Sequence, residues 1–98
     1  INIKAKLGAA VKAADAGRVA YAGNELKGFG NLILIKHNDG WITAYAHNDR
    51  LFVKKGQKVK KGEKIAAAGS TGSVNTPQLH FEIRSGTKAL NPLNYLPK

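Results

Sequence analysis

The chain contains no cysteine and no methionine, and acidic residues are few. Without cysteine, disulfides and thiolate metal ligands are excluded within these 98 residues, although the compartment is left open. Sixteen Lys and Arg oppose six Asp and Glu, which gives a net charge of +10. Such a surface attracts polyanions such as nucleic acid, anionic lipid or an acidic wall polymer, and composition does not choose among them.

Long apolar runs are also absent. The longest, Leu32 to Ile35, has the length of a strand, far from the ~20 residues that a membrane span needs. No charged-then-apolar leader opens the chain at Ile1, so we expect an excised C-terminal domain whose targeting segment lies upstream. Hydrophobic residues make up 43%, which predicts a packed core, and residues 1–98 are expected to form a single domain.

Short β-type runs separated by glycine turns dominate the sequence, and no helical period is sustained. Residues 18–22 alternate between two glycines, and residues 31–37 are rich in branched apolar side chains. The latter run ends at Asn38-Asp39-Gly40, a strong hairpin signal. The pattern predicts an all-β fold, a small barrel or sandwich of short antiparallel strands.

Two alternating segments could line a groove. From Trp41 to His47, one face carries Trp41, Thr43, Tyr45 and His47, and the other carries Ile42, Ala44 and Ala46. In the segment from Leu79 to Arg84, one side carries His80, Glu82 and Arg84. One face of each strand is expected to border the groove while the other packs.

A near-repeat between these segments predicts two successive turns. It reads VKKGQ at 53–57 and VKKGE at 59–63, too brief for a solenoid. The surrounding lysine cluster is either a solvated surface or an anion-binding patch; its members are Lys54, Lys55, Lys58, Lys60, Lys61 and Lys64. Near the end of the chain, Leu93, Tyr95 and Leu96 are expected to pack onto the body.

No local motif by itself predicts catalysis. His37 adjoins a turn, where a surface role is the ordinary one, and strand histidines such as His47 and His80 are more often hydrogen-bonded than catalytic. The chain has no H-x-H, HExxH or cysteine pair, and residues 69–72 lack the G-x-S-x-G spacing of a hydrolase elbow. Gly28-Phe29-Gly30 is not a phosphate loop.

Longer phrases carry a specific resemblance. In order, the chain reads GRVAYAG, KGFGNLILIKHNDGWITAYAHN, VKKGQKVKKGEKIAAAGSTG, LHFEIR and NPLNYLP. From about Ile1 to Pro97 it resembles the lysostaphin-type, or LytM, peptidase domain, and in particular the NlpD and EnvC branch. Members of that branch activate peptidoglycan amidases during bacterial cell separation. The resemblance implies the family's barrel-sandwich hybrid fold.

The resemblance also implies a degenerate metal site. Active members bind zinc through a His, an Asp four residues later, and the second His of an H-x-H pair; the first His of that pair and an earlier His serve catalysis. The Asp position is Asn2, the first His would precede Ile1, and the pair has become Gln78-Leu79-His80, while His47 matches the earlier His. A neutral amide is a poor zinc ligand. We therefore expect no metal, no cofactor and no hydrolysis.

What the resemblance leaves is a recognition groove, formed by Asn2, Phe29, Tyr45, His47, Gln78, His80 and Arg84. It would receive the regulatory helix of a periplasmic peptidoglycan amidase, and Arg84 would pair with an acidic side chain on that helix. The domain would be a monomer that binds no nucleic acid. It would lie in the periplasm, held to the outer membrane or envelope by upstream sequence, with peptidoglycan itself as a second partner.

Several alternatives stay open. Phe29 and Tyr45 belong either to the groove or to the core, and Arg84 has Glu82 or Glu63 as competing partners. At the level of function, the alternatives are an active zinc metalloendopeptidase that cleaves peptidoglycan cross-links, a wall-binding module, and a biotinyl- or lipoyl-type carrier. The carrier ranks last, because no acceptor lysine flanked by Met or Asp stands in a tight hairpin.

Overall fold

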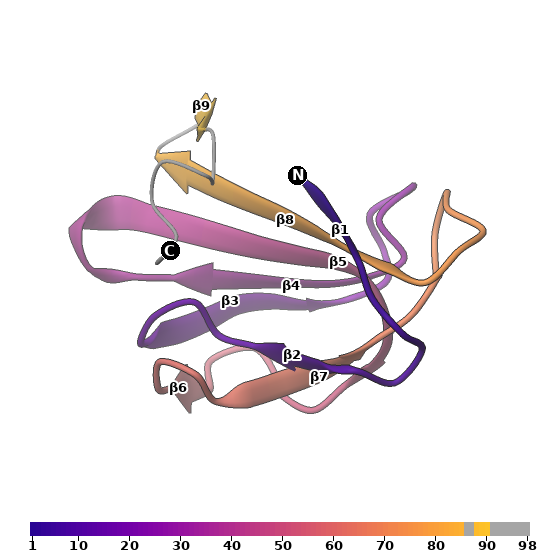
Figure 1. Ribbon diagram of the computed structural model, residues 1–98. Coiled ribbons are helices and arrows are strands. Elements are labelled where there is room, and N and C mark those ends of the chain that lie inside the picture. Colours follow the sequence, from indigo (N-terminus) through magenta and orange to yellow (C-terminus); the bar gives the residue numbers. More distant parts are fainter. Residues whose placement is uncertain (86–87, 91–98) are drawn as a thin grey trace.

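The computed structural model describes residues 1–85 and 88–90, and within them the chain is built almost entirely of strands (Figure 1). The strands are β1 (Asn2–Lys4), β2 (Ala10–Lys12), β3 (Gly17–Gly23), β4 (Asn31–Lys36), β5 (Trp41–Leu51), β6 (Lys58–Val59), β7 (Lys64–Ala68), β8 (Gln78–Ser85) and β9 (Lys88–Leu90). A short 3-10 turn, η1 (Asn38–Gly40), is the one helical segment of the described part. That part therefore offers no apolar helix of membrane-spanning length.

All strand pairs are antiparallel, in the order β1-β8-β5-β4-β3-β6. The long strand β5 organises the fold, because residues 41–46 pair with β8 and residues 48–51 pair with β7. Since β7 also pairs with β2, the sheet folds back over itself without closing (Figure 1). The predicted all-β barrel-sandwich architecture is confirmed.

The main core fills the space enclosed by the folded sheet. Its largest fully buried side chains include Val19, Ile33, Ile35, Tyr45 and Ile65. A smaller cluster of Leu32, Ala44 and Ala46 lies apart from this core. Because neighbouring strand residues point to opposite faces, β5 contributes to both clusters, Tyr45 to one and Ala44 to the other.

The two predicted KKG turns are confirmed, and they share one geometry. Gly56 and Gly62 adopt left-handed backbone, with φ of 91° and 81°, which glycine tolerates without a steric penalty. In each turn, a side-chain oxygen accepts a hydrogen bond from the backbone N–H three residues earlier (Lys54 to Gln57, 3.2 Å; Lys60 to Glu63, 3.1 Å). The predicted hairpin turn is confirmed as η1, which joins β4 to β5.

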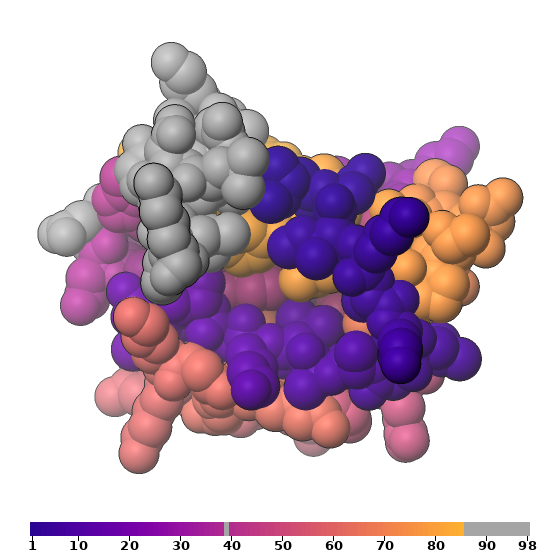
Figure 2. Space-filling view, in the orientation of Figure 1, coloured from indigo at the N-terminus to yellow at the C-terminus, as the bar shows by residue number. Residues whose placement is uncertain are grey.

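The N-terminal segment ties the two parts of the folded sheet together. β1 pairs with β8, β2 pairs with β7, and the segment crosses one face of the molecule between them (Figure 2). Asn2 is thereby placed opposite His80, 78 residues away in sequence. The predicted packing of Leu93, Tyr95 and Leu96 falls outside the described residues.

Candidate functional site

Tyr45 faces the core, so its predicted place in the groove is wrong. Its side chain is 1% exposed, and its ring lies 5.3 Å from that of Phe81, centroid to centroid. The opposite face of β5 carries Ile42 and Ala44, whose strand partners on β8 are Arg84 and Glu82. This is the face that borders the site.

A chain of hydrogen bonds explains why a tyrosine sits in the core. The Tyr45 hydroxyl accepts from the backbone N–H of Ala14 at 2.9 Å and lies 2.8 Å from Thr43 Oγ1. Thr43 Oγ1 is 2.7 Å from His37 Nε2, and His37 Nδ1 is 2.8 Å from the Ala16 carbonyl. His37, expected at the surface, thus closes a partly buried network. Burial raises the pKa of Tyr45, because these hydrogen bonds only partly offset desolvation, so the phenol stays protonated.

His47 reaches the site through an irregularity in β5. Strict alternation would place it on the face of Tyr45, but it adopts a left-handed conformation with φ 67°, at the shift in register between β5 and β4. Its backbone N–H donates to the Phe29 carbonyl at 2.9 Å, and Nδ1–H donates to the Thr71 carbonyl at 2.8 Å. The neighbouring Asn48 is fully buried and donates to the carbonyls of Asn31 and Tyr45. These bonds hold a strained residue in place.

Two glycine-rich loops form the rim beside His47, and their backbones touch. A Cβ on Gly72, which has φ 85°, would lie 2.5 Å from the backbone nitrogen of Gly30. The same contact is secured by Thr71, whose hydroxyl accepts from Asn31 N–H at 3.1 Å and donates to the Asn48 carbonyl at 2.6 Å. The GSTG phrase is therefore required for this close approach of the two loops.

His80 stands at the centre of a polar cluster. Its Nδ1 lies 2.6 Å from Asn2 Oδ1, and its Nε2 lies 2.6 Å from Glu82 Oε2. Arg84 Nε donates to the other Glu82 oxygen at 2.7 Å, so the competition for Arg84 is resolved in favour of Glu82. Both nitrogens of the His80 ring are therefore already occupied.

Glu82 is ionised in this cluster although it is partly buried. Desolvation by itself raises its pKa, but the hydrogen bonds from His80 and Arg84 and the charge of Arg84 outweigh that effect. The pKa of Glu82 is held below its ordinary value as a result. The carboxylate then fixes the orientation of the ring and the guanidinium on either side of it.

Two adjoining depressions make up the site. The polar hollow, of about 270 Å³, is lined by Asn2, Lys27, Gly28, Phe29, His47, Ser73, Val74 and His80. The apolar groove, of about 390 Å³, is lined by Leu26, Phe29, Leu32, Leu34, Ile42, Ala44, Glu82 and Arg84. Phe29 belongs to both and lies 6.4 Å from the His80 ring, while the His47 and His80 rings are 6.1 Å apart.

The structure therefore brings together five of the seven residues singled out from the sequence: Asn2, Phe29, His47, His80 and Arg84. Gln78 is on the same side of β8 as His80, but its amide donates to Thr76 and it lines neither depression. The sequence analysis missed the apolar floor. Alternation places Ile42 and Ala44 together on one face of β5, but it does not tell which face borders the site.

A folded antiparallel sheet with a histidine pair beside an open groove defines the class of lysostaphin-type peptidase domains. The catalytic domain of lysostaphin from Staphylococcus simulans matches with a TM-score of 0.91 and 33% identity, over 96% of this chain and 74% of that chain. A zinc containing peptidase from Vibrio cholerae matches with a TM-score of 0.89 and 37% identity, over 98% of this chain and 30% of that chain. The profile of Peptidase family M23 covers residues 1–92, and the chain belongs to this family.

Curated relatives are more similar in sequence. The murein hydrolase activator NlpD of Salmonella dublin is 56% identical over 98 residues, which cover 100% of this chain and 26% of that protein. The outer membrane antigenic lipoprotein B of Haemophilus influenzae is 56% identical over the same length, 24% of that protein. The resemblance stated from the sequence is confirmed, and the chain spans about a quarter of the length of these relatives.

The residues present do not fit a zinc ion. Two ligand atoms on a tetrahedral zinc lie about 3.4 Å apart, given metal–ligand distances near 2.1 Å. Asn2 Oδ1 and His80 Nδ1 are in direct contact at 2.6 Å, and Asn2 brings no charge. His80 Nε2 is bonded to Glu82. Across residues 1–85 and 88–90, no group of three or more His, Cys, Asp or Glu side chains could hold a metal.

Proposed function

We propose that the chain is a non-catalytic activator domain that binds the regulatory helix of a peptidoglycan amidase in the apolar groove and the adjoining polar hollow. Removing that helix from the amidase active site would start wall cleavage during cell separation. The observation that carries the proposal is the His80 ring, whose two nitrogens are held by Asn2 and Glu82 at the edge of an open apolar groove. This arrangement suits recognition rather than metal chemistry.

The groove has the composition that an amphipathic helix requires. Its floor of leucine, isoleucine and alanine side chains would receive the apolar face of the helix, and Phe29 would pack at its edge. Arg84 and Lys27 border the two depressions and would attract acidic side chains beside that face. The name of the NlpD relatives as murein hydrolase activators supports this use of the domain.

The relatives' names also support a place in the cell envelope. They include an outer membrane lipoprotein and a lipoprotein NlpD from Yersinia enterocolitica. We propose that this domain acts in the periplasm as a monomer, held at the envelope by sequence outside these 98 residues. It would carry neither metal nor cofactor.

The test is release of dye-labelled fragments from purified cell walls. The chain alone should release none, and adding it to a periplasmic amidase should increase release. Leu26, which is 45% exposed and lines the groove, gives the test variant Leu26→Asp. Placing a charge in the apolar contact should lower stimulation at least about tenfold.

The matched control is Leu7→Asp, because Leu7 is also an exposed leucine, at 65%, and lies outside both depressions. It should stimulate like the unchanged chain. Equal loss in both variants, or no stimulation at all, would remove support for helix binding in the groove. Metal-dependent wall cleavage by the chain alone would favour the peptidase alternative.

A further inference from the structure

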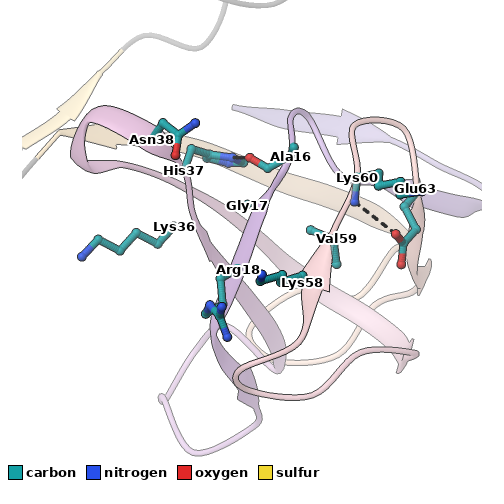
Figure 3. Close-up of a pocket in the computed structure, with 10 residues that line it drawn as sticks. All are labelled: Ala16, Gly17, Arg18, Lys36, His37, Asn38, Lys58, Val59, Lys60 and Glu63. Carbon is teal, nitrogen blue, oxygen red and sulfur yellow. Dashed lines mark hydrogen bonds between the residues drawn. The ribbon is translucent and has the colours of Figure 1, made fainter.

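Three cations stand in one row across neighbouring strands, away from the groove. Arg18 on β3 is the direct partner of Lys36 on β4, and on its other side it is the direct partner of Lys58 on β6. Directly paired residues point to the same face of a sheet, with strands about 4.8 Å apart. All three side chains are exposed. Figure 3 shows Arg18 and Lys58 side by side, with Lys36 on the neighbouring strand.

This row is unfavourable for the isolated domain, because like charges that face each other across a strand pair repel. Among the described side chains, the ion pairs are those of Glu82, so no carboxylate neutralises the row. Arg18 donates one hydrogen bond, to the Gly56 carbonyl at 3.0 Å. An anion bound from outside would relieve this repulsion, which in the free domain is only screened by solvent and salt.

The same cations border a depression with a volume of about 710 Å³, the cationic hollow (Figure 3). Lys60 adds a fourth positive charge, and Glu63 supplies the single carboxylate of the lining. Glu63 is held in place by the Lys60 backbone N–H. Lys58 lies on β6, the last strand in the order β1-β8-β5-β4-β3-β6 of the described sheet.

The mixture of charges narrows the ligand class. A dense array of phosphates, as on a nucleic acid, presents no positive group that could pair with Glu63. A short peptide with two or more carboxylates and a free amine satisfies both the cationic row and Glu63. The stem peptides of peptidoglycan have this chemistry.

We propose that the cationic hollow is a second binding site, which holds the acidic stem peptides of peptidoglycan. This inference rests on the proposed action of the domain at the wall. The pairing Arg84–Ile42–Lys36–Arg18 crosses four adjacent strands, so along the sheet Arg18 in the hollow lies three strand spacings, roughly 14 Å, from Arg84 in the groove. Peptidoglycan bound in the cationic hollow would therefore lie next to an amidase bound in the apolar groove.

The test is co-sedimentation of the 98-residue chain with purified sacculi. Lys36→Gln/Lys58→Gln should bind about tenfold more weakly at low ionic strength, because two charged contacts are lost. Lys6→Gln/Lys12→Gln removes the same charge from exposed lysines outside the hollow and should bind like the unchanged chain. Sacculi whose carboxylates are blocked by carbodiimide amidation should bind neither the unchanged chain nor the variants strongly. The binding of untreated sacculi should weaken steeply with salt.

Several results would overturn the inference. Equal loss of binding in the two double variants would indicate a diffuse charge effect, and undiminished binding to blocked sacculi would exclude the carboxylates. Binding to anionic phospholipid vesicles that depends on Lys36 and Lys58, without binding to sacculi, would assign the hollow to a membrane.

The two sites can be tested separately. Lys36→Gln/Lys58→Gln should still stimulate an amidase on soluble wall fragments, where wall attachment is not needed. The unchanged chain could fail to stimulate the amidase while its binding to sacculi still depends on Lys36 and Lys58. The proposed function would then be wrong, and the binding site in the hollow would be supported.

Discussion

His80 Nδ1 lies 2.6 Å from Asn2 Oδ1, a contact that joins β8 to β1 across 78 residues of sequence. By the resemblance described above, the two residues are expected to stand at zinc-ligand positions of the family's active members. Here they bond to each other, and Glu82 occupies the remaining ring nitrogen of His80. The cluster is closed by hydrogen bonds that a metal ion would have to break.

Restoring the carboxylate should restore some affinity for metal. Asn2→Asp places a charged oxygen beside His80 Nδ1, and we expect zinc to bind at least about tenfold more tightly than to the unchanged chain. Competition with a chelating dye measures the affinity. Asn24→Asp, at an exposed position outside the site, controls for the added charge. Similar affinities in the two variants would show that residue 2 does not limit metal binding. Wall hydrolysis should not return, because the resemblance implies that Gln78 stands where active members carry an imidazole.

The lowered pKa of Glu82 makes stability depend on pH. A carboxyl group with a lower pKa in the folded state stabilises the fold above its unfolded pKa of about 4.3, and this contribution is lost as pH falls through the folded pKa. The free energy of unfolding should therefore decrease below about pH 4.5. Glu82→Gln should flatten this decrease.

Urea unfolding between pH 7 and pH 3, followed by the fluorescence of Trp41, the single tryptophan, measures the effect. Glu25→Gln changes an exposed carboxylate that forms no ion pair among the described residues, and its pH profile should follow that of the unchanged chain. If the free energy of unfolding of Glu82→Gln depends on pH in the same way as that of the unchanged chain, the Glu82 cluster does not stabilise the fold.

The strands and turns were predictable because their signals are local. Alternating side chains mark β5 and β8, and the glycines of the KKG turns stand where the backbone is left-handed. The orientation of β5 was not predictable, because the partners that satisfy Thr43 and Tyr45 are His37 and Ala14, brought together only by the fold.

The position of His47 follows from another non-local cause. Alternation assigned it to the face of Tyr45, whereas the register shift at Asn48 and the contact with the Thr71 carbonyl turn it into the polar hollow. Asn2, Phe29, His80 and Arg84 were found through the resemblance, which carries tertiary information that strand periodicity lacks. Their roles in binding stay predictions.

The buried place of Tyr45 separates stability from binding. Tyr45→Phe leaves the Ala14 N–H without a partner and removes one of the two hydrogen bonds of the Thr43 hydroxyl, so we expect the free energy of unfolding to fall by about 1–3 kcal/mol. Amidase stimulation at a temperature where the variant stays folded should be unchanged. Tyr21→Phe removes an exposed hydrogen bond to Glu25 N–H and should cost less, about 0.5–1 kcal/mol. If Tyr45→Phe instead lowers amidase stimulation and leaves the free energy of unfolding unchanged, Tyr45 takes part in binding.

The left-handed backbone of His47 predicts an unusual order of stability. Ala and Gly both remove the imidazole and its bond to Thr71, but only Gly adopts φ 67° without strain. His47→Gly should therefore be more stable than His47→Ala by about 1 kcal/mol. At Arg50, an exposed position in the same strand with ordinary φ, the order should reverse, with Arg50→Gly less stable than Arg50→Ala by about 0.5–1 kcal/mol. Thermal and urea unfolding of the four variants measure both differences. If Ala is the more stable residue at both positions, the backbone at residue 47 relaxes without the histidine, and its conformation is imposed by the side chain rather than by the rim loops.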